Sequence, residues 1–114
     1  MSQDPRRDLS VPLPAVVRHP DGSLRNEYLV NVSVSGLCLH MRSPVSIGEV
    51  VWVSFRLPSQ ADEIQVGCKV VWTSHEGEPH PVPRFFETGL LVLDLSELDR
   101  KRIDAFVSAQ VDRR

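Results

Sequence analysis

The chain has 114 residues, of which 41% are hydrophobic and 25% are charged, and this balance predicts a single soluble globular domain with a buried core. Thirteen lysines and arginines against fifteen aspartates and glutamates give a net charge of −2, so no overall positive field attracts DNA or RNA, and binding of a nucleic-acid polymer is not expected. There is no apolar segment long enough for a signal peptide or a membrane span, and only two cysteines occur, so we expect a cytoplasmic protein without membrane insertion.

The N-terminal residues predict an arm followed by a strand. Residues 1–10 are polar, charged and interrupted by proline, and they contain too little apolar area to offset the entropy of ordering. We therefore expect a flexible N-terminal arm over 1–10, which can become ordered on a ligand. From Val11 to His19 the chain is apolar but contains two prolines, which predicts a strand at a sheet edge or a strand start. A single domain is expected over residues 11–111.

Five further strands are predicted from runs of β-branched and aromatic residues bounded by glycine and proline. Val51, Val53 and Phe55 recur with a period of two, as in a strand with one buried face. Gly67 interrupts a later run and predicts a bulge or bend. The expected strands span residues 27–34, 36–41, 49–57, 64–72 and 86–95, with a proline-rich loop over 73–84. Six short strands joined by turns predict a closed or nearly closed antiparallel barrel.

One helix is predicted at the end of the chain, over residues 96–111. Ser96 is a good N-cap, and Asp99 places a carboxylate near the positive end of the helix dipole. The residues expected to form its apolar face are Leu98, Ile103, Phe106 and Val107. We expect this amphipathic helix to cover an open part of the barrel.

Two short motifs lie on either side of the first predicted strand. Asn31, Ser33 and Gly36 form the pattern Asn, any residue, Ser, two more residues and Gly. Arg6 precedes the apolar strand, and Ser10 follows Arg6 after three intervening residues. These motifs resemble the two signature elements of the PilZ domain, a bacterial receptor module for cyclic di-GMP. One family element is Asp or Asn, any residue, Ser, two more residues and Gly, and it is matched in full. The other consists of two arginines, separated by three residues, before an apolar strand, and here Ser10 occupies the second arginine position.

The resemblance extends over nearly the whole chain, through Gly48 before a strand, the run 66–72, Gly89 and the closing helix. It implies an all-β fold with one helix, namely a six-stranded antiparallel PilZ-type β-barrel plus a C-terminal amphipathic α-helix. It places the ligand site where the N-terminal arm crosses one face of the barrel. The residues expected to bind cyclic di-GMP are Arg6, Arg7, Asn31, Ser33 and Gly36.

Ser10 affects the strength of the expected binding. A planar guanidinium pairs with guanine O6 and N7 or with phosphate oxygens and also stacks on the base, and serine does neither. The family implies that both arginines contact the ligand, so the loss of one is expected to cost about 1–3 kcal/mol, or about 5- to 150-fold in affinity. Arg7 adjoins Arg6 and is a candidate to replace part of the missing contact.

Two functional hypotheses follow. The first is a signalling adaptor that binds cyclic di-GMP, orders its arm on the ligand and regulates an unidentified effector protein in motility, surface attachment or exopolysaccharide control. The alternative is a PilZ-like protein-interaction module that does not bind the nucleotide and acts in type IV pilus or motility regulation. The lost arginine favours the second hypothesis, and the intact Asn31 element favours the first.

Catalysis, a cofactor and a metal site are not expected. The sequence offers no paired acids, no activated nucleophile and no clustered histidines. Cys38 and Cys68 lie among apolar residues, and both are expected to be buried by packing in the domain. Trp52 and Trp72 are likewise expected to pack on the barrel rather than to stack on nucleobases.

Overall fold

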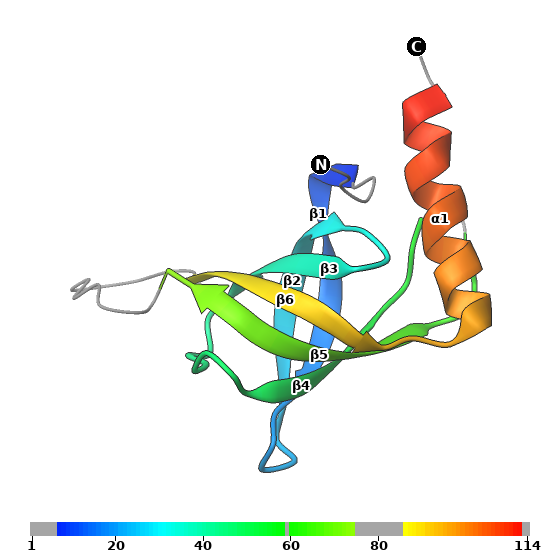
Figure 1. Ribbon diagram of the computed structural model, residues 1–114. Coiled ribbons are helices and arrows are strands. Elements are labelled where there is room, and N and C mark those ends of the chain that lie inside the picture. The colour runs from blue at the N-terminus through cyan, green and yellow to red at the C-terminus, as the bar shows by residue number, and fades with distance from the viewer. Residues whose placement is uncertain (1–6, 59, 75–85, 113–114) are drawn as a thin grey trace.

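The computed structural model describes residues 7–58, 60–74 and 86–112. These residues form six strands and one helix, in the order β1 (Arg7–Arg18), β2 (Leu24–Val32), β3 (Gly36–Met41), β4 (Val50–Phe55), β5 (Ile64–Thr73), β6 (Phe86–Asp94) and α1 (Glu97–Asp112). The strands pair antiparallel in the order β1-β2-β3-β6-β5-β4, and β4 pairs with β1 to close the barrel (Figure 1). The predicted six-stranded antiparallel barrel with a C-terminal helix is confirmed.

Strand β1 begins at Arg7, four residues before the predicted start at Val11. Arg7 and Asp8 pair with Val32 and Asn31 of β2, and the register then shifts between Asp8 and Leu13. Residues 7–10, which the sequence assigned to a flexible arm, therefore belong to a strand. The difference arises because the pairing partners are distant in sequence, so the composition of residues 1–10 does not reveal them. The rest of the predicted arm lies outside the described residues, and its mobility stays a prediction.

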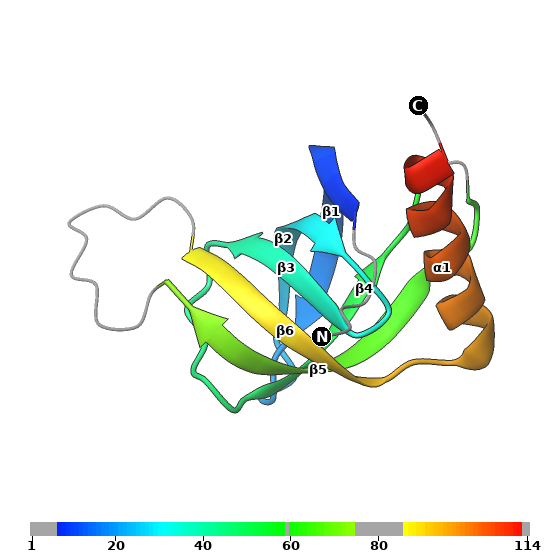
Figure 2. The same cartoon turned by 45° about the horizontal axis from the view of Figure 1, so that its top comes forward.

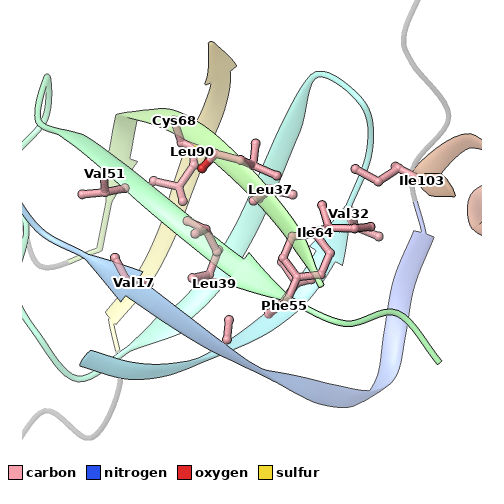
Figure 3. Packing of buried hydrophobic residues seen from close by; sticks show 14 of the residues in the cluster. Val17, Val32, Leu37, Leu39, Val51, Phe55, Ile64, Cys68, Leu90 and Ile103 are labelled. Atoms are coloured by element: carbon pink, nitrogen blue, oxygen red, sulfur yellow. Dashed lines mark hydrogen bonds between the residues drawn. The ribbon is translucent and has the colours of Figure 1, made fainter. Parts of the chain in front are cut away.

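The barrel interior is filled by the alternate residues of every strand. Val51, Val53 and Phe55 of β4 are at most 2% exposed, which confirms the alternation predicted for this run. Figure 3 shows Val51 and Phe55 among aliphatic side chains of other strands, such as Leu39 of β3, and all of them belong to one core cluster. One continuous apolar core therefore fixes the register of each strand, since a slip of one residue would expose that strand's apolar set.

Helix α1 lies at one end of the barrel, beside the start of β5 and the end of β6 (Figures 1 and 2). The Oγ of Ser96 accepts a hydrogen bond from the amide of Asp99 at 3.1 Å, which confirms the predicted N-cap. Ile103, Phe106 and Val107 are buried in the core cluster, and Figure 3 shows Ile103 directed at the barrel end.

The prediction that Leu98 shares the buried face of α1 is wrong, because this residue is 59% exposed. With 3.6 residues per turn, five positions rotate the side chain about 140° away from Ile103. Asp99 lies on the barrel side instead and holds Arg102 at 2.8 Å, while Arg102 also reaches Asp62 at 2.7 Å. This ion-pair network fixes the start of the helix against the loop before β5.

Glu27 of β2 is a buried carboxylate, with only 2% of its surface exposed. It accepts hydrogen bonds from the backbone amides of Arg42, at 2.7 Å, and Ser43, at 3.3 Å, just after β3 ends. Buried charges are stable only when hydrogen-bonded or paired, so the two amides and the carboxylate stabilise one another. This side chain therefore anchors the segment that leaves β3.

Cys68 confirms the packing role predicted for it, and Gly67 beside it confirms the predicted bulge. The register of β5 against β6 shifts between Gly67 and Cys68. Cys68 is fully buried, and burial raises the pKa of its thiol to about 12, from 9.0. A thiol with this pKa is neutral at physiological pH and is a poor nucleophile.

The raised pKa of Cys68 predicts a loss of stability at high pH. Above pH 9.0 the thiol ionises in the unfolded chain but stays protonated in the folded one up to about 12, so the folded state binds more protons and its stability falls as pH rises. At pH 9.0 half of the unfolded thiols are ionised, so the extra slope relative to Cys68→Ala should grow through this pH and approach about 1.4 kcal/mol per pH unit above it. Urea unfolding between pH 8 and 10.5 measures this difference. Equal slopes for the two proteins would contradict it.

Within the described part of the chain, no helix is both long enough and apolar enough to cross a membrane.

Candidate ligand-binding groove

A groove of about 490 Å³ runs along the outer surface of β3 and its neighbours. Leu37, Leu39 and Met41 of β3 face the core, whereas Cys38 and His40 alternate with them and face the groove. Residues of β1, β2, β5 and β6 complete its walls, and we call it the β3–β6 groove. Its volume lies within the range of about 300–1,000 Å³ found for small-molecule sites.

The structure brings three of the predicted ligand residues together in this groove, namely Asn31, Ser33 and Gly36. They lie at the end of β2, in the connection to β3 and at the first position of β3. The motif spacing therefore places them at one end of the groove.

Ser33 is held by the turn in which it lies. Its Oγ accepts from the amide of Gly36 at 3.0 Å and donates to the carbonyl of Gly36 at 3.1 Å. The Ser33 amide donates to the same carbonyl at 2.9 Å, and the residue is only 5% exposed. The hydroxyl thus fixes the β2–β3 connection, and its contribution to the groove is to position the neighbouring backbone.

Position 36 requires glycine because the backbone of β6 lies close to it, and not because of its backbone angle. A Cβ at this position would lie 3.1 Å from the carbonyl oxygen of Leu90 in β6. Its φ is not in the left-handed region; among the described glycines, only Gly22 and Gly48 are. The close approach of β6 therefore explains the glycine at this position, and a left-handed turn does not.

The side chain of Asn31 is hydrogen-bonded to β1. Its Nδ2 donates a hydrogen bond to Oδ1 of Asp8, which pairs with it across β1 and β2. Asp8 was not among the predicted site residues, yet it lines the groove. Its carboxylate lies where the amide of Asn31 would meet a ligand.

Trp72 forms part of the groove wall at the other end. Its indole lies directly over Gly89, since a Cβ added to Gly89 would overlap the ring, with Cε2 2.8 Å away. The predicted packing of Trp72 on the barrel is therefore confirmed. Trp72 is also 44% exposed and lines the groove, which the sequence analysis did not anticipate.

The ionisable groups of the groove are mostly acidic. Asp8 and Glu87 contribute carboxylates, and His40 Nε2 lies 3.7 Å from Oε2 of Glu87. No lysine or arginine occurs among the described residues that line the groove. Positive charge for an anionic ligand must therefore come from elsewhere in the chain.

The structure does not bring Arg7 into the groove. Its Nη1 donates to the backbone carbonyl of Phe106 in α1 at 3.1 Å, and its guanidinium lies 4.0 Å from the centre of the Phe106 ring. Alternation along β1 explains this position, because adjacent residues face opposite sides of a strand and Asp8 takes the groove side. Ser10 borders a separate recess beside Arg7 and Phe106, and Arg6 lies outside the described residues.

Of the described residues, no group of three or more histidine, cysteine or acidic side chains is arranged to hold a metal ion. The cysteines described, Cys38 and Cys68, are not joined in a disulfide. The predicted burial of Cys38 is wrong, because this residue is only partly buried and lies on the groove side of β3.

A closed antiparallel barrel, capped at one end by a helix and carrying a polar groove of small-ligand size, defines a compact β-barrel module. More specifically, the chain belongs to the PilZ domain family, whose family model matches residues 2–109. The resemblance inferred from the two motifs is confirmed by this match.

Solved structures share the fold. The Bacillus subtilis inhibitor of motility MotI/DgrA superimposes with a TM-score of 0.77 at 16% identity, over 100% of this chain and 53% of that protein. The K. pneumonia MrkH–c-di-GMP complex gives a TM-score of 0.73 at 17% identity, over 97% and 52%. The PilZ domain with c-di-GMP of YcgR from Escherichia coli gives 0.71 at 12% identity, over 99% and 98%.

The chain thus spans about half the length of MotI/DgrA and MrkH. The search of curated proteins finds no match to the sequence.

Proposed function

We propose that this chain is a cytoplasmic PilZ signalling adaptor that binds cyclic di-GMP in the β3–β6 groove and regulates an effector protein. The observation that carries the proposal is the convergence of Asn31, Ser33 and Gly36 on one groove in a chain of this family. The neighbours MrkH and YcgR were solved with c-di-GMP, which supports the same class of ligand here. No catalytic step is proposed.

The charge of the groove determines how such a ligand would be held. Cyclic di-GMP carries two phosphates and two guanines, and the described lining contains carboxylates but no lysine or arginine. We propose that Arg6 and Arg7 of the N-terminal segment supply the missing positive charge. Both arginines are close in the sequence to Asp8, which lines the groove.

Binding would also rearrange the contacts of β1. For Arg7 to reach the ligand, its guanidinium must leave Phe106, and for Asn31 to use its amide, the bond to Asp8 must open. The order of the N-terminal segment and the position of α1 would then depend on the ligand, which gives an effector protein a changed surface to recognise. Motility, surface attachment and exopolysaccharide production are the outputs that the family implies.

A second candidate is a PilZ-like protein-interaction module that does not bind the nucleotide. The contacts of Arg7 favour it, because this arginine already has partners in α1. Ser10 favours it as well, since it removes a cation from the family's arginine motif. In this case the groove and its neighbours would contact a protein without a nucleotide switch.

Calorimetric titration of cyclic di-GMP separates the two candidates. We expect saturable binding that is weakened about 5- to 150-fold in Arg6→Ala and strengthened by a similar factor in Ser10→Arg, as one bidentate arginine contact is lost or gained. Arg25→Ala removes an exposed arginine of β2 outside the groove and serves as the matched control, with unchanged affinity expected. Absence of binding in the natural protein would overturn the proposal in favour of the interaction module, whatever Ser10→Arg does.

A further inference from the structure

Glu87 lies next to the exposed tryptophan of the groove. It precedes Gly89 by two positions on β6, so both residues face the same side of that strand. Trp72 covers Gly89, and Glu87 and Trp72 both line the groove. A ring lying on Trp72 would therefore have its edge near the carboxylate of Glu87.

The backbone of Glu87 is held by Ser74 through both its amide and its carbonyl. Its amide donates to Oγ of Ser74 at 2.9 Å, and its carbonyl accepts from the amide of Ser74 at 2.8 Å. Ser74 follows β5 directly after Thr73, so these two bonds tie Glu87 to the strand that carries Trp72. The relation between the two backbones is thus set by main-chain geometry. The side chain of Glu87, whose Oε2 lies 3.7 Å from His40 Nε2, is the part that can adjust to a ligand.

Glu87 and the signature residues lie at opposite ends of the groove. Gly36 and His40 are four residues apart on β3, which corresponds to about 13 Å at about 3.3 Å per residue. Glu87 pairs with His40, whereas Gly36 pairs with Leu91. A dinucleotide would therefore have one end near Asn31 and Ser33 and a base near Trp72 and Glu87.

A carboxylate at the position of Glu87 would distinguish guanine from adenine. Ionised glutamate accepts hydrogen bonds and donates none. The Watson–Crick edge of guanine presents two donors, N1–H and the N2 amino group, whereas that of adenine presents an acceptor at N1. Glu87 would gain two charge-assisted hydrogen bonds from guanine and would face the lone pair of adenine N1.

We propose that Glu87 is a specificity-determining residue that accepts hydrogen bonds from the Watson–Crick edge of a guanine stacked on Trp72. The inference rests on the proposed function and goes beyond it, because it assigns the choice of base to a residue outside the two signature motifs. Glu87 then selects guanine over adenine at this end of the groove.

The test compares cyclic di-GMP with cyclic di-AMP in the natural protein, Glu87→Gln and Glu63→Gln. Both ligands carry the same phosphates, so any repulsion between Glu87 and phosphate cancels in the ratio of the two dissociation constants. Glu63→Gln removes an exposed carboxylate outside this groove and is the matched charge control. Titration calorimetry measures all six affinities, and quenching of Trp72 fluorescence in a Trp52→Phe background reports whether the base reaches the indole.

We expect the natural protein and Glu63→Gln to prefer cyclic di-GMP, and we expect the preference to fall about 5- to 150-fold in Glu87→Gln. Glutamine donates as well as accepts, so it tolerates adenine. An unchanged preference in Glu87→Gln would overturn the inference and leave the proposed function intact. Failure of the natural protein to bind either nucleotide would overturn both.

Discussion

Replacement of Glu27 by alanine should lower the free energy of unfolding by about 2–4 kcal/mol, because it leaves two backbone amides without their charged acceptor in a buried place. The amides of Arg42 and Ser43 donate to this carboxylate at 2.7 Å and 3.3 Å. Since small domains are stable by only about 5–15 kcal/mol, the loss is a large part of the total. Urea unfolding followed by circular dichroism measures it.

Two variants show whether burial causes this effect. Glu49 also accepts a backbone amide, that of Ser46 at 3.0 Å, but at an exposed turn, so Glu49→Ala should cost less than about 1 kcal/mol. Glu27→Gln keeps one acceptor oxygen, so its loss of unfolding free energy should lie between those of Glu27→Ala and Glu49→Ala. If Glu27→Ala costs no more than Glu49→Ala, the carboxylate of Glu27 does not anchor the end of β3.

Gly89→Ala should weaken cyclic di-GMP binding about 5- to 150-fold, because the new methyl group would occupy the space of the Trp72 indole and force it off β6. Stacking of a base on an aromatic side chain contributes about 1–3 kcal/mol, which corresponds to this range. Titration calorimetry gives the affinity, and the emission maximum of Trp72 reports the displacement of the ring.

Gly67→Ala provides a matched control for this variant. Gly67 lies beneath the other tryptophan, and its Cβ would lie 3.1 Å from Cη2 of Trp52, outside the β3–β6 groove. Its affinity for the nucleotide should equal that of the natural protein. If Gly89→Ala displaces the Trp72 indole without changing the affinity, Trp72 does not contact the nucleotide. The stacking on which the role of Glu87 depends would then be absent.

The strands could be predicted from the sequence where the information is local. The bounds of β3, Gly36–Met41, agree with the prediction to the residue, and those of β4 and β6 differ by one or two positions. Alternating apolar residues and flanking turn residues suffice for such elements. The start of β1 could not be predicted, because Asp8 and Arg7 are held by partners 23 and 99 residues away.

Local sequence information likewise predicted only some of the groove residues. Asn31, Ser33 and Gly36 are close in sequence, so a motif was enough to group them. Trp72 and Glu87 join them only because β6 inserts between β3 and β5, a strand order that no local pattern encodes. The position of Arg7 was missed for a related reason, since its partner Phe106 belongs to the last element of the chain.

The strand order also constrains how the domain assembles. β1, β2 and β3 pair with their neighbours in sequence, as do β4 and β5, but β3 has no second partner until β6 is in place. Without β6, the first five strands could pair only as one open sheet, in the order β3-β2-β1-β4-β5, with β3 and β5 at its edges. The pairing of β6 with both of these edges closes the barrel, and it also supplies Glu87 and Gly89 to the wall of the groove. The barrel and the groove are thus completed by the same strand.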